Sequence, residues 1–238
     1  MQIARLDELH RLAETLYTET ETLPKEQRKK RICDEIEELL ILAYIFGTDR
    51  VLGDIARFER ENGISSREGE RMREALQEEL QGRDLSEELR KALQEGREED
   101  LRETLEIPVR ARELYETVYK PIAGETFEQR VDRRLRDGTL TKDTLERIID
   151  TDYHRCEETG AYNTAVNYAE ENGRTPYKIW RTMLDDRVRD THWYIEGVEV
   201  PMDERFYTFD NDSARFPGDF EKVENNANCR CWLSFNFK

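Results

Sequence analysis

The chain has 238 residues, with 54 acidic against 38 basic side chains and a formal net charge of −16. Its mean hydropathy is −0.91, yet Leu, Ile, Tyr and Phe recur regularly enough to predict a folded chain with a hydrophobic core. The acidic balance argues against tight DNA binding, because affinity for phosphates depends on Lys and Arg displacing counterions.

The first part of the chain is predicted to be helical. Apolar residues recur at helical spacing from Ile3 to Leu16, and Pro24 breaks that segment. A second helix is expected over residues 32–46, with its end at Gly47, since glycine often terminates helices. Residues 51–60 are predicted to form a third, separate helix.

The next segment is highly charged. Asn62-Gly63 closes the third predicted helix, and Ser65-Ser66-Arg67-Glu68 then offers a capping box, in which a Ser side chain and Glu68 satisfy exposed amides reciprocally. Residues 67–106 interleave acids with arginines, which is typical of a solvated helical hairpin or of a helical arm that lies on a partner. Breaks in the following segment are expected at Pro108, Pro121, Gly124 and Asp137-Gly138.

A long helix is expected from about Thr141 to Asn172. Its predicted inner face carries Leu145, Ile148, Ile149, Cys156, Ala165, Val166 and Ala169. Short runs of aromatic and β-branched residues then predict strands within residues 177–183, 199–200, 206–209 and 231–237. The sequence therefore predicts an α+β fold, in which a mainly helical region over residues 1–136 precedes a small α+β domain over residues 137–238. In that domain the long helix should pack on a short antiparallel sheet.

The last third of the chain carries an ordered series of short motifs. They read W-R-T-M-L-D-D-R-V-R-D-T-H-W-Y-I-E-G-V-E-V-P from Trp180, F-P-G-D from Phe216 and N-C-R-C from Asn228. Ile148-Ile149-Asp150-Thr151 and Tyr162-Asn163-Thr164-Ala165 precede them on the long helix. This series resembles the C-terminal domain of Mu F-like minor head proteins, which include head-morphogenesis proteins of many tailed phages.

The resemblance implies a structural minor head protein that associates with the portal and aids head assembly or genome delivery. The helical region, residues 1–136, would dock on the portal protein or on the major capsid protein. The implied location is the virion, inside the capsid near the portal vertex, with the host cytoplasm as the place of assembly. Packaged DNA would lie nearby without being bound tightly, because the acidic chain repels it.

Two further expectations concern the surroundings of the protein. Residues 1–5 lack the apolar core of a signal peptide, and the longest apolar run, residues 39–46, is too short to cross a bilayer, so no membrane partner is expected. Arg is commoner than Lys, which suits a halophilic host, where salt screens the charged surface, or reflects a GC-rich genome.

A polar cluster is predicted after the strand at residue 180. Asp185, Asp186, Arg187 and Arg189 lie close together in sequence, and bidentate pairs between carboxylates and guanidiniums can fix an irregular loop. Asn228, in the N-C-R-C motif, is assigned to the same cluster. We expect these residues to have a structural role.

Cys229, Cys231 and His192 are candidate metal ligands. On an extended strand the side chains of residues i and i+2 share a face, so both sulfurs could reach one point, and with His192 they would give three ligands for zinc. Zinc prefers four ligands, and Cys156 or His154 on the long helix could supply the fourth. The alternative is that the cysteines are small buried side chains, with His192 hydrogen-bonded to the loop and no cofactor bound.

Known catalytic signatures are missing from the sequence. It lacks the H-x-E and P-C-x-x-C pair of zinc deaminases, the G-x-S-x-G nucleophile elbow, the P-loop and the G-x-G-x-x-G motif. A metal-dependent hydrolase or nuclease that uses Asp185, Asp186 and His192 is the alternative, although neighbouring arginines would engage those acids. We therefore expect a protein that is not an enzyme.

Overall fold

The computed structural model describes residues 2–64, 70–71, 73–74 and 111–238. The predicted capping box at Ser65–Glu68, the charged segment at residues 75–106 and the break at Pro108 lie outside these residues. In the described part of the chain, no helix combines the length and the apolar character needed to cross a lipid bilayer.

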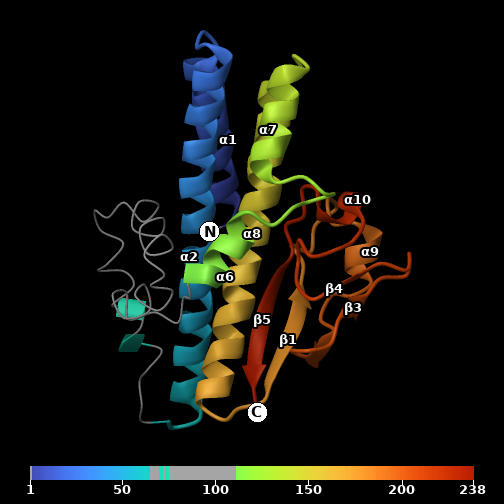
Figure 1. The fold of residues 1–238 in the computed structure, drawn as a ribbon. Helices are drawn as coiled ribbons and strands as arrows, with labels where there is room; N and C mark the ends of the chain where they lie inside the picture. Colours follow the sequence, from blue (N-terminus) through green and yellow to red (C-terminus); the bar gives the residue numbers. More distant parts are fainter. Residues whose placement is uncertain (1, 65–69, 72, 75–110) are drawn as a thin grey trace.

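Three long helices run alongside one another: α1 (Gln2–Thr20), α2 (Lys25–Glu61) and α8 (Lys142–Glu171). In Figure 1, α2 and α8 lie side by side, and the sheet lies on the other side of α8. Two shorter helices, α6 (Ala111–Val118) and α7 (Phe127–Arg136), also contact α2 and α8. The prediction of a mainly helical first part is confirmed.

The predicted end of a helix at Gly47 is wrong, because α2 continues without a break to Glu61. Gly47 instead lies where α2 crosses α8: a Cβ atom there would be 1.9 Å from the backbone oxygen of Glu157. On α8, a Cβ atom at Gly160 would be 2.1 Å from the backbone oxygen of Tyr44. Glycine at both positions therefore allows the two helix backbones to touch, and the second and third predicted helices are one helix.

The long helix α8 has the predicted boundaries. Thr141 accepts a hydrogen bond from the amide of Thr144, whose side chain accepts one from the amide of Thr141, and Asn172 is the C-cap residue. The predicted inner face is buried, apart from Val166, which is partly buried against the core. The helix is buried on more than one side, because it packs against α2 as well as against the sheet.

The sheet is antiparallel, with strand order β2-β1-β5. Its strands are β1 (Pro176–Arg181), β2 (Glu199–Pro201) and β5 (Trp232–Phe237). A separate two-stranded ladder joins β3 (Phe206–Tyr207) to β4 (Ser213–Ala214), a strand too short to be predicted. Two single-turn helices, α9 (Asp190–Trp193) and α10 (Val223–Asn226), complete this part.

The predicted α+β fold is therefore confirmed: a helical first part is followed by a long helix on a short antiparallel sheet. The division between residues 136 and 137 stays a prediction. One buried hydrophobic cluster includes side chains from both sides of it, from Leu9 on α1 to Phe237 on β5.

Candidate functional site

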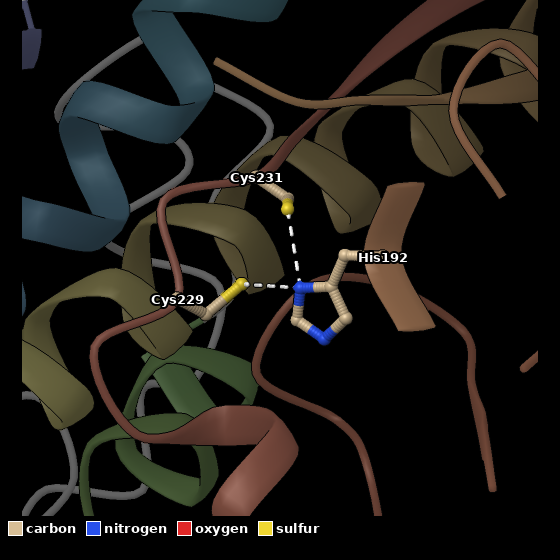
Figure 2. A group of neighbouring side chains, drawn as sticks. All are labelled: His192, Cys229 and Cys231. Carbon is tan, nitrogen blue, oxygen red and sulfur yellow. Dashed lines mark hydrogen bonds between the residues drawn. The ribbon is translucent and has the colours of Figure 1, made fainter. Parts of the chain in front are cut away.

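The three predicted metal ligands lie together in the core of the C-terminal part (Figure 2). The Nδ1 atom of His192 is 3.3 Å from the sulfur of Cys231 and 3.7 Å from that of Cys229. One ligand atom from each residue fits within 4.8 Å of the others, and none of the three side chains is more than 6% exposed. The structure thus confirms that these side chains meet, without testing whether they bind a metal.

The two sulfurs meet at a turn and not on a strand, because β5 begins only at Trp232. Asn228 has a positive φ of 53°, and the amide of Cys229 donates to the backbone oxygen of Asn226. The side chain of Asn226 in turn exchanges two hydrogen bonds with the backbone of Phe220. This turn therefore brings Cys229 and Cys231 to one point, as the sequence predicts, by a different local structure.

His192 is held against the turn from α9. Arg189, which precedes α9, donates from its guanidinium to the backbone oxygen of Ala227. The imidazole of His192 stacks on the ring of Phe220, with centroids 5.1 Å apart, and meets Trp180 edge-on. The ring orientation of His192 is therefore fixed by aromatic neighbours.

The predicted polar cluster is only partly assembled. Asp185 forms a bidentate pair with Arg230, at 2.7 and 2.8 Å, and also accepts from the amide of Arg187. The side chains of Asp186 and Arg187 are exposed. The partner of Asp185 is thus Arg230, in the middle of the C-R-C motif, and not one of the arginines next to it in the sequence. The hydrogen bonds from Arg230 lower the pKa of Asp185.

The two candidates for a fourth ligand differ in position. The sulfur of Cys156 is directed at the backbone oxygen of Thr117, 4.0 Å away, on the α6 side of α8. The imidazole of His154, also on α8, lies next to Cys229. Burial opposes the charged form of His154, but Cys229 and nearby acids raise its pKa overall.

The four cysteines have different surroundings. Burial raises the pKa of both Cys33 and Cys156 to about 12, so these thiols stay protonated. The pKa of Cys229 is instead well below its usual range, because Cys231 and His192 hydrogen-bond it and His154 lies next to it. The hydrogen bond to Cys229 raises the pKa of Cys231 in turn.

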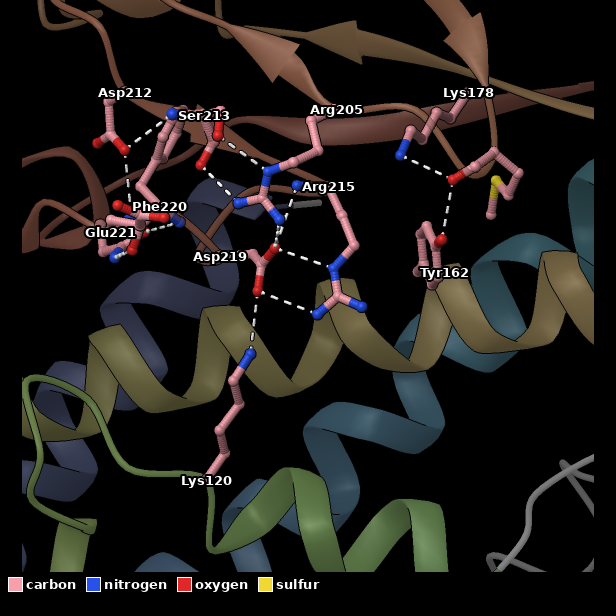
Figure 3. Close-up of polar contacts among 12 residues, drawn as sticks. Lys120, Tyr162, Lys178, Arg205, Asp212, Ser213, Arg215, Asp219, Phe220 and Glu221 are labelled. Atoms are coloured by element: carbon pink, nitrogen blue, oxygen red, sulfur yellow. Dashed lines mark hydrogen bonds and ion pairs between the residues drawn. The ribbon is translucent and has the colours of Figure 1, made fainter.

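A second polar network surrounds Asp219, the last residue of the F-P-G-D motif (Figure 3). Its carboxylate accepts from Lys120 at 3.0 Å and from the Nε atom of Arg215 at 3.1 Å, and Arg205 lies 3.6 Å away. Arg215 and Lys120 lower the pKa of Asp219 in spite of its burial. Because Lys120 lies between α6 and α7, Asp219 ties the loops of the C-terminal part to the helical part.

Two buried polar groups support the same loops. The carboxylate of Asp212 accepts four hydrogen bonds, from the amides of Ser213, Glu221 and Lys222 and from the side chain of Asn225. Lys178 on β1 is fully buried and donates to the backbone oxygen of Met202 at 2.9 Å. Burial lowers the pKa of Lys178 to about 8. Neither contact was predicted, since each joins residues that are well separated in the sequence.

The geometry does not assemble the alternative carboxylate–imidazole site. Within residues 2–64, 70–71, 73–74 and 111–238, the one group of three or more potential metal ligands is His192, Cys229 and Cys231. Asp185 is engaged by Arg230, and Asp186 is exposed. Nothing in this arrangement favours a hydrolase or nuclease.

Comparison with known proteins matches the part of the chain that carries these networks. The profile of the family described as Phage Mu protein F like protein matches residues 83–234, which is more than half of the chain. A curated relative, minor head protein GP7 of Bacillus phage SPP1, is 27% identical over 114 residues.

Those residues are 48% of this chain and 36% of GP7, so the chain spans about a third of that relative's length. No solved structure matches the chain. The profile match includes every motif from Ile148 to Cys231 and begins well before the first of them. On this match, the chain belongs to the family of Phage Mu protein F like proteins.

Proposed function

We propose that this protein is a structural minor head protein of a tailed virus and that it works beside the portal during head assembly or genome delivery. The observation that carries the proposal is the family match over residues 83–234, joined by the similarity to a minor head protein of phage SPP1. The proposed location is the virion, inside the capsid near the portal vertex.

The polar networks around three carboxylates suit a structural role. Asp185, Asp212 and Asp219 each accept several hydrogen bonds, most of them from residues outside the strands. Such carboxylates fix loops in one conformation, and they leave no free acid–base pair in these networks for catalysis. This supports an architectural protein over an enzyme.

The charge of the chain indicates what it contacts inside a head. At a net charge of −16, its surface repels packaged DNA, so its stable neighbours should be proteins. Exposed apolar side chains such as Tyr194 and Phe209, which meet edge-on, can form contacts that salt does not screen. We propose the portal protein as the main partner and the major capsid protein as a second neighbour.

Co-expression with the portal protein of the same virus tests this proposal. The chain should co-sediment with the portal oligomer and should stay bound from low salt to about 1 M salt, because apolar contacts are not screened. The portal of an unrelated phage is the specificity control. Failure to co-sediment, or complete release at moderate salt, would contradict the proposal.

A further inference from the structure

We propose that His154, His192, Cys229 and Cys231 bind one zinc ion, with His154 on α8 as the fourth ligand. The site would be structural, since four protein ligands leave no open position for water or substrate. It would join three segments that are far apart in the sequence: α8, α9 and the turn that leads into β5.

The distances from His192 to the two sulfurs fit a tetrahedral site. With Zn–S bonds of about 2.3 Å and Zn–N bonds of about 2.0–2.1 Å, tetrahedral angles place sulfur and nitrogen roughly 3.6 Å apart. The measured separations from the Nδ1 atom of His192 are 3.3 Å to Cys231 and 3.7 Å to Cys229. The dashed lines in Figure 2 therefore join atoms that are already spaced as ligands of one ion.

The position of His154 points to it as the fourth ligand. Its imidazole lies next to Cys229 from α8. Its Nε2 atom is buried without a hydrogen-bond partner. It is not within 4.8 Å of all three other ligands, so coordination requires its side chain to shift toward the centre. Cys156 cannot take this place, because its sulfur is directed at Thr117.

The charges balance when the ion is bound. Two thiolates, formed as Cys229 and Cys231 release their protons, neutralise a divalent cation, and both imidazoles bind in their neutral form. A neutral centre can be buried at low cost, whereas an isolated buried thiolate cannot. The rings of Trp180 and Phe220 cover the site, and the Arg230–Asp185 pair lies beside it.

Zinc content and cobalt spectroscopy of the purified full-length chain test the proposal. We expect about one zinc per chain, and we expect Co²⁺ in its place to show the absorption of a tetrahedral site with two thiolates. A chelator should lower the melting temperature. A folded chain that lacks zinc, does not take up Co²⁺ and melts unchanged with chelator would overturn the proposal, as would a disulfide between Cys229 and Cys231.

Single substitutions separate the ligands from other buried groups. Cys229→Ser and Cys231→Ser each remove one of the two thiolates, so each should lower the thiolate absorption of the Co²⁺ form. Each should also weaken zinc affinity by more than the roughly 10–100-fold that loss of a supporting residue costs. Cys156→Ser, at a buried cysteine of α8, is the matched control and should bind zinc as the wild type does.

His154→Gln tests the fourth ligand specifically. We expect weaker zinc binding, by at least about tenfold, and an altered Co²⁺ spectrum, because a water would replace one imidazole. If this variant binds zinc as tightly as the wild type with an unchanged spectrum, His154 is not a ligand and the four-ligand site is refuted. Zinc uptake is measured on refolding, so a variant that is less stable still gives a result.

Discussion

Single carboxylates hold the irregular part of this protein together. Asp219 is 8% exposed at its side chain and lies within 4.0 Å of three cations, while Asp212 and Asp185 each satisfy several donors. A buried carboxylate that loses its charge leaves these donors unpaired, and that cost exceeds the modest value of an ordinary surface ion pair. The loops after β1 should therefore depend on a few acids.

Replacing Asp219 by Asn should lower the free energy of unfolding by about 1–3 kcal/mol, since Lys120, Arg205 and Arg215 would keep their charges without the carboxylate. The control is Asp203→Asn, the same change at an exposed site, which should have little effect. Urea unfolding of both variants measures the difference. Equal stability of the two variants would contradict a stabilising role for the Asp219 carboxylate.

Asp219 should also make the stability of the fold depend on pH. Arg215 and Lys120 hold the pKa of Asp219 below its value in the unfolded chain, which is about 3.9. Its stabilising contribution is therefore fully present above that pH and is lost as the pH falls through the lower pKa of the folded state. In Asp219→Asn this part of the acid sensitivity should be missing.

For single residues, the sequence predicted which side chains belong to a site better than it predicted which side chains they contact. Cys229, Cys231 and His192 could be predicted as a group, because their residue types share one chemistry. The partner of Asp185 could not, since Arg230 is distant in sequence and Asp186, Arg187 and Arg189 offered nearer alternatives. Only the fold brings Arg230 to Asp185.

Helices α2 and α8 approach each other closely where they cross. Gly47 and Gly160 allow the two backbones to touch, and hydrogen bonds from α8 support the same crossing: Asn163 donates to Tyr44, and Thr164 donates to Thr48. Arg50 on α2 adds an ion pair of 2.7 Å with the buried Glu158. Side chains larger than hydrogen at the two glycines would separate the helices.

Gly160→Ala and Gly47→Ala should each destabilise the fold by about 3 kcal/mol or more, because the added Cβ atom would overlap a backbone oxygen. Gly53→Ala, in the same α2 helix, is the control. A Cβ atom there would be 3.5 Å from the nearest atom of Arg73, so this change should stabilise the helix by roughly 0.5–1 kcal/mol. Chemical unfolding followed by helical circular dichroism distinguishes the two outcomes, and similar effects at all three positions would contradict the close crossing.

Element boundaries could be predicted where local chemistry sets them. Thr141 and Asn172 bound α8 as expected, because capping and helical periodicity act within a few residues. Gly47 could not be interpreted correctly, since the reason for glycine there lies on another helix, at Glu157. The strand β4 was missed, as two residues carry no periodic pattern.

For the whole molecule, the family match supports a head-protein role, and its matched region, residues 83–234, contains the motifs and the polar networks. The net charge of −16 argues separately against tight DNA binding. Composition and periodicity could predict the fold class and the acidic surface. The head-protein role came from the order of the motifs, because no single residue in them performs a recognisable reaction.

The most direct test of the head-protein role is the location of the chain in purified virions. Quantitative mass spectrometry of separated heads and tails should find the protein in the head fraction, in fewer copies than the major capsid protein. Absence of the chain from purified particles, or its presence in the tail fraction alone, would contradict the role proposed here.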